Sequence, residues 1–347
     1  MNSLILAISV SLAAASAPPP PSALRQPYDD LVAAYLQQGT VDSALNVVSG
    51  WSHPMIKALV QDVANDAKKT KRIEAAAMLH TECALRLFVN RPDESAFHFG
   101  LAHTLVLALR QAPVGSSTDS DQFRRAWYRF SSSVFVARAQ FDIAQQLIGE
   151  GLSGFADDHD LRLLSGIANE VMAYAADDNL GRPSAERSRR SLAQVDILLR
   201  RAETAYRRAL QDSNGDQEAR LRLGWVLFLE GQSSAARDQL ESIAQGTHAT
   251  VRQEYLRHLF LGALDDEDPT AALHEYEAAR EIAPQFQTAY IAISGLQERR
   301  GDHLQAHEAA IEFWSATRSN AEDPWWDYRL GAVDATALEL LRSEIRQ

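Results

Sequence analysis

Histidine pairs are the residues of this chain whose spacing first suggests metal chemistry. His303 and His307 lie four residues apart in a segment of helical periodicity, so their imidazoles share one face, as two ligands of a divalent metal would. Ile311 occupies the next turn, where a third ligand would be needed. His-Glu pairs at 274–275 and 307–308 begin the HExxH zinc motif, but neither is followed by its second histidine. We therefore expect no metal site.

A glycine motif and several carboxylate pairs could also carry chemistry. Residues 149–154 read GEGLSG and match GxGxxG, but a dinucleotide site needs a strand before the glycines, and FDIAQQLI before them has helical periodicity. The glycines are better explained as the end of that helix. Acidic pairs fall at expected helix termini or turns, where acidic side chains favour helix N-termini: Asp29-Asp30, Asp157-Asp158 and Asp265-Asp266. We expect no catalytic residue and no cofactor.

Composition limits the classes of function further. The 347 residues carry a net charge of −12, which gives no support for nonspecific binding to nucleic acid. Cys83 is the one cysteine, so neither an intrachain disulfide nor a cysteine-built zinc site can form, and we expect a small buried hydrophobic residue there. The length exceeds that of a typical single core and suits several domains or an elongated solenoid.

The N-terminus has the pattern of a secretory signal. An apolar run from Leu4 to Ala15 is too short to cross a bilayer comfortably and is followed by small residues and four prolines. We predict a signal peptide over 1–17, with cleavage favoured after Ala15, and a proline-rich linker over 18–27. The mature chain would then be periplasmic or secreted, without an integral membrane segment. An uncleaved anchor is the alternative.

A repeated alanine indicates how these segments are organised. Four 12-residue segments carry Ala at their third position, with spacings of 34, 36 and 34 residues: Ala202, Ala236, Ala272 and Ala306. Such a period is typical of stacked helix pairs, because one pair cannot bury its apolar face alone. Helical periodicity with turn residues continues upstream, and no segment reads as a sheet. The sequence thus predicts an all-α fold.

The repeat resembles the tetratricopeptide repeat (TPR) family. Leu223-Gly224, Gly231 and Ala236 follow the family pattern, as do Ala272, Tyr276 and Pro284. The resemblance implies a right-handed α-solenoid of antiparallel helix pairs. It is clearest over about 185–318 and patchy over 28–176. We accordingly expect a degenerate helical-repeat half at 28–155, TPR-like repeats at 156–320 and a C-terminal capping segment at 321–347.

The resemblance also implies a binding face, since TPR domains present a concave surface built from the first helix of each pair. Six residues are expected on or near it: Arg129, Leu221, Trp225, Phe228, Arg257 and Leu261. Trp225 and Phe228 fit the helical core equally well. The Lys and Asn side chains with which the family grips a C-terminal carboxylate are missing from the matching stretches.

Two other segments are candidates for contact with a partner. The segment from Asp323 to Tyr328 places Trp325, Trp326 and Tyr328 within four positions, as a partner contact or as a cap on the core of the solenoid. Arginines crowd the expected helix over 186–211, which could dock an acidic partner or a membrane surface, or could be a solvated face.

We therefore expect an exported, non-catalytic scaffold that binds another protein or peptide in the cell envelope. Two alternatives stay open: an accessory or catalytic domain acting on envelope material, and a structural subunit of an envelope assembly. The repeat does not encode the identity of the partner.

Overall fold

The structure is a computed structural model that describes residues 21–38, 41–48, 50–65, 70–110, 117–177, 189–213, 215–244, 249–316, 322–331, 333 and 335–346. These residues form helices and connecting turns, with no strand among them. The predicted signal peptide at 1–17 lies outside the described residues. None of the helices in the described ranges is both long and apolar enough to cross a membrane.

The chain divides into two compact units, Met1–Arg124 with Leu340–Gln347 and, between them, Arg125–Glu339. Unit 1 contains five whole helices, α1 (Pro21–Gln38), α2 (Val41–Val48), α3 (His53–Asn65), α4 (Thr70–Leu87) and α5 (Pro92–Leu109). The first turns of α6 (Ser117–Ala137) and the end of α17 (Ala335–Arg346) complete it. Within this unit α4 packs along α5, and α4 is also contacted by α1, α2 and α3.

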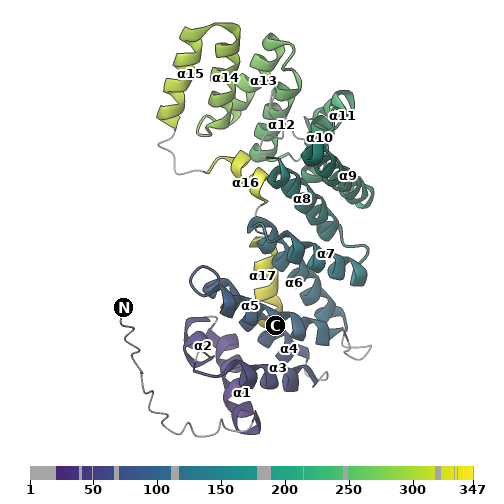
Figure 1. Ribbon diagram of the computed structural model, residues 1–347, viewed down its shortest axis with the longest axis vertical. Coiled ribbons are helices and arrows are strands. Elements are labelled where there is room, and N and C mark those ends of the chain that lie inside the picture. Colours follow the sequence, from purple (N-terminus) through teal and green to yellow (C-terminus); the bar gives the residue numbers. More distant parts are fainter. Residues whose placement is uncertain are drawn as a thin grey trace, which may run out of the picture. The chain divides into compact units, whose positions relative to one another are not determined.

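Unit 2 is a series of antiparallel helix pairs (Figure 1). The rest of α6 is followed by α7 (Phe141–Gly154), and then come α8 (His159–Ala176) with α9 (Arg189–Asp212) and α10 (Gln217–Leu229) with α11 (Ser233–Ala244). The last pairs are α12 (Val251–Leu264) with α13 (Pro269–Ile282) and α14 (Thr288–Arg300) with α15 (His303–Ala316). Each pair packs on the next, as α9 does on α10 and α13 on α14, which makes this a TPR-like solenoid. The prediction of an all-α fold is confirmed.

The recurring alanines lie inside these helix pairs. Ala202, Ala236 and Ala272 are completely buried, and Ala306 is 4% exposed. Small residues at these sites let the two helices of a pair approach, and large apolar side chains then fill the space between pairs. The spacing of the alanines in the sequence therefore reflects a helix contact that recurs in each pair.

Glycines on the first helix of three pairs make the same close approach possible. A methyl group added to Gly262 would lie 2.5 Å from the ring of Tyr276 on α13, and one added to Gly166 would lie 2.3 Å from Tyr206 on α9. A methyl group added to Gly224 would lie 2.8 Å from the side chain of Leu240 on α11. At each of these glycines, a large side chain from the second helix of the pair packs directly against the backbone of the first helix.

Capping residues fix where these helices begin and end. Asp216 and Asp268 accept hydrogen bonds from the first amides of α10 and α13, and Thr250 forms a capping box with Gln253 at the start of α12. Gly301 ends α14 with a φ of +81°, which a residue without a β-carbon adopts at little cost. These short-range signals set the pair lengths.

The N-terminal helix begins earlier than the sequence suggests. Helix α1 starts at Pro21, inside the range predicted as a linker. Proline is well tolerated in the first turn, because the amides there have no partner within the helix. The chain turns between α6 and α7 at Ala139, which has a φ of 55°, and the Gln140 amide donates to the Phe135 carbonyl at 2.9 Å.

The close approach at Gly262 gives a direct test of this packing. We expect Gly262→Ala to destabilise the protein by about 1–3 kcal/mol, because the new methyl group must displace the buried Tyr276 ring. The matched control is Gly295→Ala on α14, whose methyl group would meet only Arg299, at 3.8 Å. That control should gain up to about 1 kcal/mol from helix propensity. Urea unfolding followed by circular dichroism measures both, and equal shifts of the two midpoints would contradict the packing account.

Candidate functional site

Five of the six residues expected on a concave face lie on α10 and α12 of unit 2. Leu221 and Trp225 lie on α10 and Leu261 on α12, each at most 4% exposed, and Arg257 on α12 is 9% exposed. Phe228 is half-buried and packs against the same cluster. These side chains are covered by other parts of unit 2, and the described contacts show what covers Trp225.

Trp225 is the centre of an aromatic cluster. Its ring stacks on Phe260 of α12 at 4.4 Å between centroids and lies 5.0 Å from Phe228. On α8, Tyr174 accepts a hydrogen bond from its indole nitrogen. The ring of Trp325 meets it edge-on, at 5.6 Å and 90°. Because Trp325 lies far along the chain from Trp225, a C-terminal segment supplies part of the cover.

That segment is the short helix α16 (Pro324–Leu330) with its N-cap Asp323. Tyr328 is fully buried, with its ring 5.1 Å from Phe260 and 4.2 Å from the Arg222 guanidinium carbon. Trp325 and Tyr328 are three residues apart and their rings are parallel at 5.8 Å, so they present one face of the helix. Trp326 is 49% exposed. We call the surface formed by Tyr174, Arg222, Trp225 and Phe260 the aromatic face.

Asp323 fastens the start of the segment to another helix. One carboxylate oxygen caps α16 by accepting from the Trp325 amide at 2.9 Å. The other accepts from the amides of Gln287 and Thr288 at 2.8 and 2.7 Å, from the Thr288 hydroxyl at 2.8 Å and from the Tyr255 hydroxyl at 3.2 Å. These amides open α14, where a helix favours an anion. Asp323 is 4% exposed, so its charge depends on these donors.

A buried charge network lies beneath Tyr328. Arg222 donates to Glu218 at 2.8 Å and to Glu170 at 3.2 Å, and Glu170 also accepts from the Tyr206 hydroxyl at 2.6 Å. Burial raises the pKa of Glu170, against the opposing effect of Arg222. Burial also acts on Glu218, but Arg222 and Arg252 hold the pKa of that carboxyl below its ordinary value. The network orients the Arg222 guanidinium beneath the Tyr328 ring and joins α8, α9 and α10.

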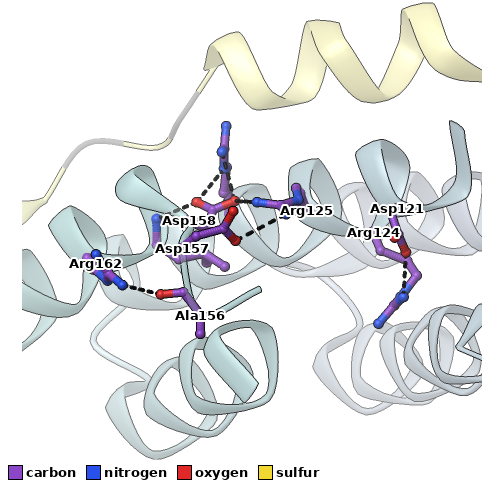
Figure 2. Close-up of polar contacts among 9 residues, drawn as sticks. Asp121, Arg124, Arg125, Ala156, Asp157, Asp158 and Arg162 are labelled. Atoms are coloured by element: carbon purple, nitrogen blue, oxygen red, sulfur yellow. Dashed lines mark hydrogen bonds and ion pairs between the residues drawn. The ribbon is translucent and has the colours of Figure 1, made fainter. Parts of the chain in front are cut away.

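Arg129 of α6, the sixth predicted residue, belongs to a separate ion-pair cluster. It donates to both carboxylate oxygens of Asp158, at 3.0 and 2.8 Å. Arg125, also on α6, donates hydrogen bonds to Asp158 at 3.4 Å and to Asp157 at 3.2 Å (Figure 2). Asp158 is 1% exposed and caps α8 through the Leu161 amide. Arg129 therefore ties α6 to the start of α8, away from the aromatic face.

The histidines that suggested chemistry are placed differently. His303 is 73% exposed and bonds to Glu298 at 3.0 Å, an interaction that raises the pKa of His303. Across the described ranges, no group of three or more His, Cys, Asp or Glu side chains is arranged to hold a metal ion. The glycines of residues 149–154 lie in the last turns of α7, where Gly151 faces Tyr128 and Leu161. Cys83 is fully buried, as predicted.

A histidine pair in unit 1 was not anticipated from the sequence. The Tyr28 hydroxyl lies 3.0 Å from His80 Nε2, and His80 Nδ1 lies 2.9 Å from His98 Nδ1. Burial lowers the pKa of His80 well below its ordinary value and that of His98 to about 4, so both rings are neutral near pH 7. His80 has no exposed surface for a substrate to reach. Its position directly after the apolar run AAAML was the available signal.

Comparison with known proteins gives matches among solved structures alone. No protein-family model matches the sequence, and no curated protein does so either. Among solved structures, MamA from Desulfovibrio magneticus RS-1 is 21% identical, with a TM-score of 0.41 over 57% of this chain and 98% of its own. Human IFIT1, solved as a dimer with m7Gppp-AAAA, is 13% identical, with a TM-score of 0.41 over 78% of this chain and 68% of its own. The helix pairs of the chain itself establish a TPR-like repeat protein.

Proposed function

We propose that this protein is a TPR-like scaffold that binds a short segment of another protein on the aromatic face. The observation that carries the proposal is that this face already holds a peptide segment, Asp323–Leu330. Stacked rings and an arginine under a tyrosine hold this segment, and such contacts dominate the energy of many protein interfaces. The role proposed is one of binding and not of catalysis.

The contacts of the segment define the chemistry of a partner. A carboxylate would take the place of Asp323 at the start of α14, and aromatic residues two and five positions later would take the places of Trp325 and Tyr328. A partner must compete with a segment of the same chain, whose effective concentration is on the order of millimolar for a short connection. The segment thereby favours partners that match its chemistry closely.

We also propose that the scaffold works in the cell envelope, after export. The support is the apolar run from Leu4 to Ala15 with the small residues that follow it. The partner that meets the aromatic face would then be a protein of the same compartment.

A peptide copy of the segment tests the binding role. The Trp325→Ala/Tyr328→Ala variant should release its own segment, and a labelled peptide with the sequence of Asp323–Leu330 should then bind it with micromolar affinity by fluorescence anisotropy. Adding Trp225→Ala should weaken binding by at least about tenfold, because the central ring is lost. Adding Trp314→Ala instead, at a tryptophan that is 70% exposed on α15, should leave the affinity unchanged.

The peptide itself supplies a control that leaves the protein untouched. A peptide with alanine in place of the first tryptophan and the tyrosine should not bind. Equal binding of both peptides, or full affinity in the variant carrying Trp225→Ala, would contradict recognition by the aromatic face.

Export has its own test. When the full chain is produced in a Gram-negative bacterium, we expect it in the periplasmic fraction with Ser16 as its first residue by N-terminal sequencing. The double change Ile8→Arg/Leu12→Arg interrupts the apolar run with two charges and should keep the chain in the cytoplasm. Recovery of the unprocessed chain from the cytoplasm of cells producing the wild type would contradict export.

A further inference from the structure

A second surface of unit 2 lies apart from the aromatic face, between α7 and α9. It is a cleft of about 610 Å³ whose floor is formed by α8. One wall is apolar, with Ile148 and Leu152 of α7, and the other is the outer side of α9. Small residues keep it open, since Gly149 has no side chain and Ala168 of the floor has only a methyl group.

The α9 wall carries exposed arginines. Arg201 and Arg208 line the cleft, and neither guanidinium group forms a hydrogen bond or ion pair with another described residue. Arg200 lines the cleft as well, but it lies close enough to Glu230 for its charge to act on that carboxyl group. Arg207, beside them on the same helix, does pair with Glu203, at 2.8 Å. Arg201 and Arg208 are seven residues apart, so their α-carbons are separated by about 10 Å along the helix. The wall thus presents exposed positive charges within an acidic chain.

The floor of the cleft holds a buried polar group without a partner. Asn169 is 7% exposed, and its side-chain oxygen has no hydrogen-bond donor among the described residues, although its nitrogen donates to the Ser165 carbonyl at 2.7 Å. This oxygen has almost no exposed surface of its own, so a ligand in the cleft would meet the arginines and the apolar side chains instead. The cleft therefore offers a place for carboxylates and for apolar side chains.

We propose that this cleft binds an acidic segment of a second protein. A peptide brings carboxylates for Arg201 and Arg208 and apolar side chains for Ile148 and Leu152 in one molecule. A lipid headgroup or a free phosphate would use the arginines and leave the apolar wall unmatched. This site is independent of the proposed function of the aromatic face.

Selection from a peptide library tests the proposal without a known partner. Random peptides of about twelve residues displayed on phage are selected against the full chain and against its Arg201→Gln/Arg208→Gln variant, whose changes lie on exposed side chains and spare the core. The wild type should enrich peptides that combine two or more acidic residues with apolar ones. The double variant should lose that class. Arg207→Gln, one residue from Arg208 but paired with Glu203, is the matched control and should retain it.

Affinities of the enriched peptides decide between the possible ligands. We expect the double variant to bind them at least about tenfold more weakly, which is about 1.4 kcal/mol, and Trp225→Ala to bind them as the wild type does. Binding should also weaken as salt is raised, because exposed charges are screened. Enrichment of peptides without acidic residues, or equal affinity in the double variant, would overturn the proposal. So would arginine-dependent binding to phosphatidylglycerol vesicles without binding to any acidic peptide.

Discussion

The close approach of the two helices in each pair is the constraint on which the rest of unit 2 depends. Wherever one helix presents a ring or a branched side chain, the other helix needs a residue with little or no side chain. Gly262, which lies beneath the Tyr276 ring, is such a residue. Once the pairs close in this way, successive first helices lie side by side, and their outward positions are fixed to within the tolerance of a packed core. Trp225 and Phe260 can stack at 4.4 Å because α10 and α12 are held at that separation.

The aromatic face follows from this arrangement, and the chain covers it with its own residues. A bare surface of Tyr174, Trp225 and Phe260 would expose a large apolar patch, which proteins usually conceal or use. Here Trp325 and Tyr328 pack on it, while Asp323 joins the segment to the start of α14. The segment Asp323–Leu330 stabilises the fold, and its side chains also indicate which kind of ligand the aromatic face would accept. The binding proposal rests on this second point.

The parts of this structure that the sequence predicts are those encoded over short distances. The 34-residue alanine spacing reports a contact inside each helix pair, and cap residues such as Asp216 and Asp268 act on amides two or three positions away. The bonds from Asp323 to Thr288 and from Tyr28 to His80 join residues 35 and 52 positions apart, and no local pattern records them. The arginines of α9 were visible in the sequence, whereas the facing wall of α7, which makes a cleft of them, was not.

Amide hydrogen exchange at the start of α14 tests most directly that Asp323–Leu330 is held on the aromatic face. The amides of Gln287 and Thr288 precede the first intrahelical bonds, so their protection depends on the Asp323 carboxylate, at 2.8 and 2.7 Å. Measured by NMR, both amides should exchange slowly in the wild type and in Glu322→Ala, and rapidly in Asp323→Ala. Rapid exchange in the wild type, or equal protection in Asp323→Ala, would contradict the account.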